Sequence, residues 1–90
     1  MRISKEAKEV LTLVASGEAI GHRKCGGVAP FLEDQRGYRK PFHGRILKAL
    51  LRHGLVEKID QTVNNRGAVE YWYALTDLGR SVAEGVPPKH

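Results

Sequence analysis

Cysteine, methionine and tryptophan each occur once in these 90 residues, and aromatic residues make up only 7% of the chain. Because Cys25 is alone, no intrachain disulfide can form, which fits a reducing, cytoplasmic setting. Long apolar runs are also missing, so we expect neither a signal peptide nor a membrane span. Folding must rest on one modest hydrophobic core, which a chain of this length can form as a single domain over residues 1–85.

The sequence also has few of the side-chain groupings on which catalytic and metal sites depend. His22, Cys25, His43 and His53 offer one thiol and scattered imidazoles, whereas structural zinc usually takes four ligands in closely spaced pairs. No oriented acid or base accompanies Cys25, and the glycines around it are not followed by the G-K-[ST] of a phosphate-binding loop. We therefore expect no enzyme, no metal and no cofactor.

Basic residues are plentiful and unevenly placed. The formal net charge of the chain is +5, yet residues 21–53 hold eight lysines and arginines against only Glu33 and Asp34. This segment alone therefore carries a net charge of +6. Such a concentrated band is expected of a surface that binds a polyanion, although a basic surface also serves solubility.

Residues 41–53 show the clearest helical pattern in the chain. Their apolar and basic side chains fall on two separate stripes of a 3.6-residue helix. The apolar stripe holds Ile46, Leu47, Leu50 and Leu51, and the basic stripe holds Arg45, Lys48 and Arg52. Pro41 suits the first turn of this helix, and Gly54 suits the position after its last turn. We therefore expect one face of this helix to pack in the hydrophobic core and the other to bind a negatively charged partner.

The remaining elements are predicted from caps, turns and periodicity. Ser4 caps a helix over 4–16, and Thr76 caps a last short helix that Gly85 ends. Residues 17–27 read as a loop with at most a very short strand near 19–20, and 28–36 as a short helix. Alternation on both sides of the turn 64–67 predicts a β-hairpin over 55–75. The last residues, 86–90, contain two prolines and are expected to form a flexible tail.

Two segments resemble bacterial regulators of the MarR and PadR kind. The stretch I-L-K-A-L-L-R-H-G-L-V-E-K (46–58) is similar to the end of the recognition helix and the start of the wing in those families. The stretch Y-A-L-T-D-L-G (73–79) is similar to the end of the second wing strand and the helix that follows. The resemblance implies an α+β winged helix-turn-helix, with a three-helix core, a two-stranded wing and a short C-terminal helix.

The resemblance also implies a transcriptional regulator that binds double-stranded DNA sequence-specifically. Helix 41–53 would lie in the major groove and the wing tip, 63–68, on the backbone or in the minor groove. The chain departs from the family pattern at two of the predicted contacts, His43 and Gly44. The predicted DNA-binding residues are Arg39, Lys40, His43, Gly44, Arg45, Lys48, Arg52 and Arg66. For Arg45, a bidentate contact to guanine and a phosphate contact are equally good interpretations.

The sequence leaves open the oligomeric state and an alternative function. A homodimer through the terminal helices is compatible with the sequence but not implied by it. The alternative function is a protein–protein interaction module that does not bind DNA directly. In that module Trp72 and the neighbouring tyrosines would form the contact patch, whereas the band of positive charge over 21–53 favours DNA.

Overall fold

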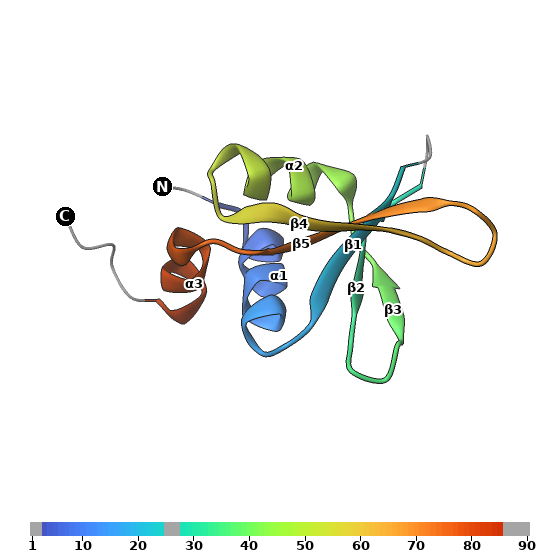
Figure 1. Ribbon diagram of the computed structural model, residues 1–90. Coiled ribbons are helices and arrows are strands. Elements are labelled where there is room, and N and C mark those ends of the chain that lie inside the picture. Colours follow the sequence, from blue (N-terminus) through green and yellow to red (C-terminus); the bar gives the residue numbers. More distant parts are fainter. Residues whose placement is uncertain (1–2, 25–27, 86–90) are drawn as a thin grey trace.

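The computed structural model describes residues 3–24 and 28–85, which form three helices and five strands (Figure 1). In chain order these are α1 (Lys5–Ala15), β1 (Ala19–Arg23), β2 (Phe31–Glu33), β3 (Arg39–Pro41), α2 (Gly44–Arg52), β4 (Val56–Val63), β5 (Val69–Leu75) and α3 (Asp77–Glu84). The predicted tail, 86–90, and Cys25 lie outside the described residues. None of the helices within 3–24 and 28–85 is long and apolar enough to cross a membrane.

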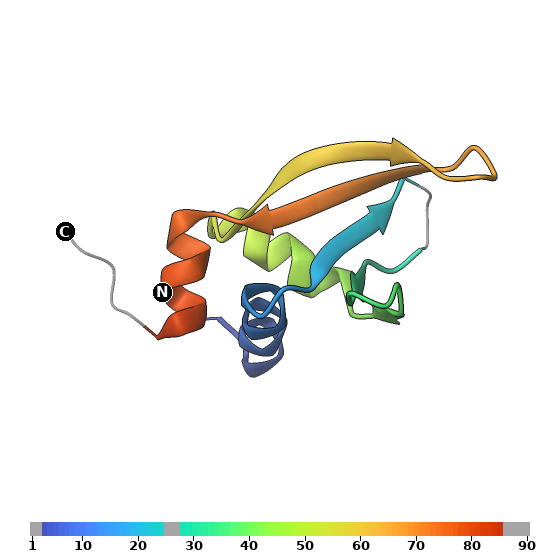
Figure 2. The ribbon, with the colours of Figure 1, turned by 60° about the horizontal axis from the view of Figure 1, so that its bottom comes forward.

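The five strands form one antiparallel sheet in the order β3-β2-β1-β5-β4. Strand β1 is central, so that Gly21 lies opposite Phe31 of β2 on one side and Trp72 of β5 on the other. Strand β4 lies at one edge, and its register against β5 shifts between Lys58 and Asp60. The β4–β5 hairpin extends well beyond the rest of the molecule (Figures 1 and 2).

The winged helix-turn-helix predicted from the sequence is wrong for this chain. Where a second core helix was expected, over 28–36, the chain instead forms β2, a tight turn and β3, and both strands extend the sheet. Phe31 and Leu32 are both buried although adjacent, because they face opposite sides of the sheet. Gly37, with φ 82°, closes the turn that a helix would have run through. A short apolar run of this length fits a strand and a helix equally well by periodicity.

The start of the predicted helix 41–53 is also wrong, because Pro41 ends β3 and α2 begins only at Gly44, after the N-cap His43. The remaining elements lie close to their predicted positions. Helix α1 begins after Ser4, whose hydroxyl accepts a hydrogen bond from the Ala7 N–H, and α3 begins after Thr76, which caps Gly79 in the same way. The β4–β5 hairpin spans nearly the whole of the predicted 55–75. Residues 19–20 belong to a strand, and that strand is longer than expected.

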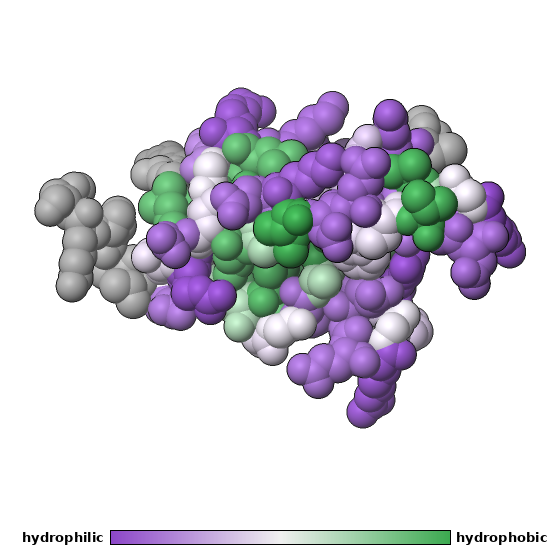
Figure 3. Space-filling view, in the orientation of Figure 1, coloured by the Kyte–Doolittle hydropathy of each residue, from purple (hydrophilic) through white to green (hydrophobic). Residues whose placement is uncertain are grey.

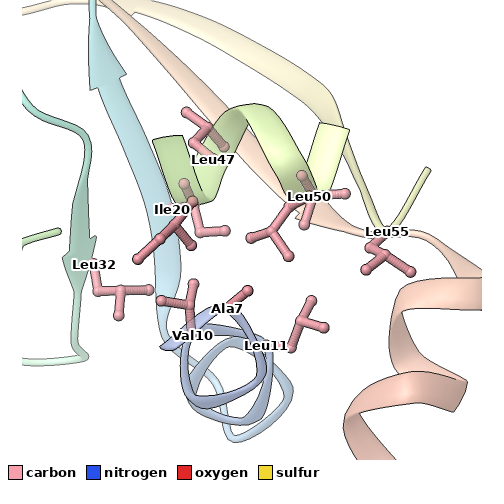
Figure 4. Close-up of a cluster of buried hydrophobic side chains, with 10 residues drawn as sticks. Ala7, Val10, Leu11, Ile20, Leu32, Leu47, Leu50 and Leu55 are labelled. Atoms are coloured by element: carbon pink, nitrogen blue, oxygen red, sulfur yellow. The ribbon is translucent and has the colours of Figure 1, made fainter. Parts of the chain in front are cut away.

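The hydrophobic core lies between α1, α2 and one face of the sheet (Figure 4). Leu11 of α1, Ile20 of β1, Leu50 of α2 and Leu55 are completely buried there. Leu47 and Leu50 of α2 belong to one buried cluster with Ala7, Val10 and Leu11 of α1. This packing fixes which side of α2 faces outward.

Candidate nucleic-acid interface

The outward side of α2 carries its basic residues. Ile46, Leu47 and Leu50 are buried, while the side chains on the opposite stripe are exposed. These exposed basic residues are Arg45, Lys48 and Arg52. Hydrophilic side chains accordingly line the upper rim of the molecule, where α2 lies (Figure 3). The predicted separation of an apolar and a basic stripe is confirmed, with one exception: Leu51 is 41% exposed and borders the basic side.

The positive charge on α2 has no acidic counterpart nearby in the sequence. Residues 35–56 contain six lysines and arginines and no aspartate or glutamate. Three ion pairs occur within the described part of the chain, and none of them involves α2. Arg52 lies in the last turn, where the helix dipole favours a cation, whereas Arg45 lies in the first turn, where it does not.

Arg39, one of the predicted DNA contacts, forms two ion pairs within the protein on the face of the sheet away from the core. Its Nε donates to Glu33 at 2.8 Å, and its Nη1 donates to Glu70 at 2.8 Å. Arg23 also donates to Glu70, at 3.3 Å. Glu70 is only 3% exposed, so its carboxylate depends on these two arginines. Hydrogen bonding to Arg39 is the main reason why the pKa of Glu70 lies below its usual value.

Aromatic rings complete this cluster. The Arg39 guanidinium lies 4.3 Å from the centre of the Phe31 ring, and Phe31 meets Trp72 edge to face at 5.7 Å. The indole N–H of Trp72 donates to the Thr62 hydroxyl at 2.8 Å. We refer to Arg23, Phe31, Glu33, Arg39, Glu70 and Trp72 as the arginine–aromatic cluster. It forms a second, smaller centre of packing on the face of the sheet that the helices leave open.

Three further predicted contacts lie around the start of α2. Lys40 is exposed on β3, on the opposite face of that strand from Arg39. His43 is the N-cap of α2, and its Nδ1 accepts a hydrogen bond from the Arg45 N–H at 3.2 Å. Gly44 is half-buried, and a Cβ there would lie 3.7 Å from Pro30. This distance is an ordinary van der Waals contact, so packing on Pro30 does not require a glycine at this position.

Arg66 lies exposed at the tip of the β4–β5 hairpin, on a turn that recurs elsewhere in the chain. The Asn64 side chain accepts hydrogen bonds from the backbone of Arg66 and Ala68, and Gly67 has φ 81°. The β2–β3 turn repeats this pattern, since the Asp34 side chain accepts from the backbone of Arg36 and Tyr38.

Each of these turns thus carries an exposed arginine before a glycine of positive φ. The repeat is visible in the sequence itself, as D-Q-R-G-Y and N-N-R-G-A, and is the signal that predicts the β2–β3 turn. The β2–β3 turn lies on the side of the molecule away from α2 (Figure 1).

Comparison of the chain with protein-family models, with characterised proteins and with solved structures finds no match. The likeness of 46–58 and 73–79 to MarR and PadR regulators therefore stays a resemblance between short segments.

Proposed function

We propose that this protein binds double-stranded DNA through the outward face of α2. The observation that carries the proposal is the stripe of Arg45, Lys48 and Arg52, exposed and outside every ion pair of the described residues. At about 1.5 Å per residue this stripe is roughly 10 Å long. An α-helix of this kind fits the major groove of B-DNA, and its cations would replace condensed counterions.

The positions along the helix suggest different roles for its cations. Arg45 is nearest the start of α2, where it would contact either a guanine edge or a phosphate. Lys48 and Arg52 would bind phosphates farther along the groove. Arg66, on a turn held rigid by Asn64, would contact the backbone or a narrow minor groove. A sequence-specific binder built in this way would suit the regulation of transcription.

Fluorescence anisotropy with a mixed-sequence duplex at several salt concentrations tests the proposal. We expect affinity to fall steeply with salt, by roughly one power of salt concentration for each phosphate neutralised. Flat or absent binding even at about 50 mM salt would contradict the proposal.

The repeated turn supplies a matched control for the contact by Arg66. Arg36→Ala and Arg66→Ala each remove one positive charge from the same kind of turn, but only Arg66 is proposed to touch DNA. Arg66→Ala should lower both the affinity and the salt slope, whereas Arg36→Ala should change neither beyond a small uniform effect. Equal losses would mean that net charge, rather than contact at the hairpin tip, determines binding.

A protein-interaction module is the second candidate, and its support lies on β4. Trp72, the contact expected for this function, packs instead on Phe31 and donates to Thr62. Ile59 and Val63, however, are 60% and 65% exposed on this edge strand. Apolar side chains reach the surface over the β4–β5 hairpin in Figure 3. Absence of DNA binding by the wild-type protein in the anisotropy titration would favour this second candidate.

A further inference from the structure

The first turn of α2 has little stability of its own. Its N-cap is a histidine with a 3.2 Å hydrogen bond, and no acidic residue lies in the first turn. Gly44 is a poor helix former, and the positive charge of Arg45 lies near the positive end of the helix dipole. The orientation of this turn must therefore come largely from the residues that precede it.

Those residues belong to β3, which ends at Pro41, three positions before α2 begins. Phe42 connects the two elements, and its N–H donates to the Pro30 carbonyl at 2.9 Å. On β3 itself, Arg39 is bound to Glu33 of β2 and to the buried Glu70 of β5. Arg39 thus connects the start of α2 to β5, the strand on the other side of β1 in the sheet.

We propose that Arg39 is a positioning residue for the DNA-binding helix, with Glu70 as its anchor. By holding β3, Arg39 fixes the first turn of α2 and thereby the direction in which Arg45 meets DNA. This inference rests on the proposed function and changes the role of Arg39 within it. Arg39 acts on DNA through α2 and makes no contact of its own.

The alternative role for Arg39, a direct phosphate contact, predicts the opposite effect of losing Glu70. If Arg39 touched DNA, Glu70 would only compete for its guanidinium, and Glu70→Gln would strengthen binding by releasing Arg39 and removing a negative charge. If Arg39 positions α2, the same substitution weakens binding although the protein becomes more basic. The sign of the change separates the two roles.

The experiment compares the affinity of Glu70→Gln, Arg39→Lys and the wild type for one mixed-sequence duplex. We expect Glu70→Gln to weaken binding by at least about five-fold, the lower bound for one bidentate base contact. Arg39→Lys keeps the charge but loses the two-pronged contact with both glutamates, and it should weaken binding in the same direction. Because the Arg39 side chain is 36% exposed, this variant should fold even if Glu70→Gln does not.

Glu57→Gln is the control, since it removes one negative charge from an exposed position on β4 that forms no ion pair within the described residues. It should leave affinity unchanged or raise it slightly. Tighter binding by Glu70→Gln, or wild-type affinity in Arg39→Lys, would overturn the positioning role while leaving DNA binding by α2 intact. If the wild-type protein did not bind DNA, the proposed function itself would be contradicted.

Hydrogen exchange without DNA gives a second readout. In Arg39→Lys the amides of residues 44–48 should exchange faster than in the wild type, while those of α1 keep their protection. A uniform increase over the whole chain would indicate general destabilisation and contradict a positioning role.

Discussion

Arg39 and Glu70 bond at 2.8 Å although two strands, β2 and β1, separate their own strands in the sheet. Neighbouring strands lie about 4.8 Å apart, so a flat sheet would hold these residues at about 14 Å between backbones. Two long side chains that reach toward each other span that gap, and the rings of Phe31 and Trp72 fill the space beside the pair. The open face of the sheet thereby gains a packed centre of its own.

Gly21 makes this packing possible. A Cβ at that position would lie within 2.6 Å of the Phe31 ring and 2.9 Å of the Trp72 ring. We expect Gly21→Ala to lower the free energy of unfolding by about 1–3 kcal/mol, the usual cost of overpacking. Urea denaturation followed by tryptophan fluorescence measures this directly. An unchanged midpoint would show that the rings can move aside at no cost.

Glu70 should make the stability of the protein depend on acid pH. Hydrogen bonds from Arg39 and then Arg23 lower its pKa from the usual 4.5, against the effect of burial. A carboxylate with a lowered folded-state pKa contributes stability above its unfolded pKa and loses it as the pH falls through the folded value. In urea titrations the wild type should therefore exceed Glu70→Gln in stability at pH 7, and the difference should shrink steadily below about pH 4.5. A difference independent of pH would exclude this ion-pair contribution.

Two substitutions on α2 should separate affinity from sequence preference. Lys48→Ala should weaken binding to all duplexes alike and reduce the salt slope by about one, as expected for a phosphate contact. Arg45→Ala should also narrow the gap between a preferred site and random DNA if Arg45 reads a guanine. Selection of a preferred duplex from a random pool, followed by anisotropy on both, measures the two effects. Unchanged affinity in both variants would mean that a different face of the protein binds DNA.

Leu51 provides a test of groove contact that does not involve charge. It is exposed beside Lys48 on the outward side of α2, where an aliphatic side chain could contact the methyl group of thymine. Replacing thymines of the preferred duplex by deoxyuridine, one at a time, should reveal a position where affinity falls. Leu51→Ala should abolish the difference at that position, and Ile59→Ala, on the exposed β4, should leave it unchanged. If deoxyuridine left the affinity unchanged at every position, such a contact with a thymine methyl group would be excluded.

The helices and the long hairpin could be predicted because their signals are local. Ser4 and Thr76 are good caps, the apolar spacing of α2 is regular, and the turn at Asn64 is followed by a glycine. In contrast, Phe31 and Leu32 form an apolar pair too short to show a period. Strand β2 forms by pairing with β1, and β3 forms in turn by pairing with β2. The pairing of β2 with β1 cannot be read from propensity within 28–36, whereas the D-Q-R-G-Y turn between β2 and β3 is a local signal that the sequence does carry.

The same distinction applies to the candidate site. Arg45, Lys48 and Arg52 could be placed together because helical geometry determines their common face. Arg39 looked like part of that basic band because its partner Glu70 is 31 residues away and meets it only through the register of the sheet. A count of charges over a short segment includes Arg39 but not the distant Glu70 that neutralises it.

The shift of register in β4 has a consequence for how the protein behaves at high concentration. An edge strand of eight residues with two exposed aliphatic side chains is a template on which strands of other molecules could add and grow into fibres. The extra residue at Ile59 places Lys58 and Asp60 on opposite faces, since they lie opposite the consecutive residues Tyr73 and Trp72. A copy approaching this edge therefore finds neither a flat row of backbone groups nor matched side chains. We therefore expect the irregularity in β4 to disfavour edge-to-edge association between copies of the protein.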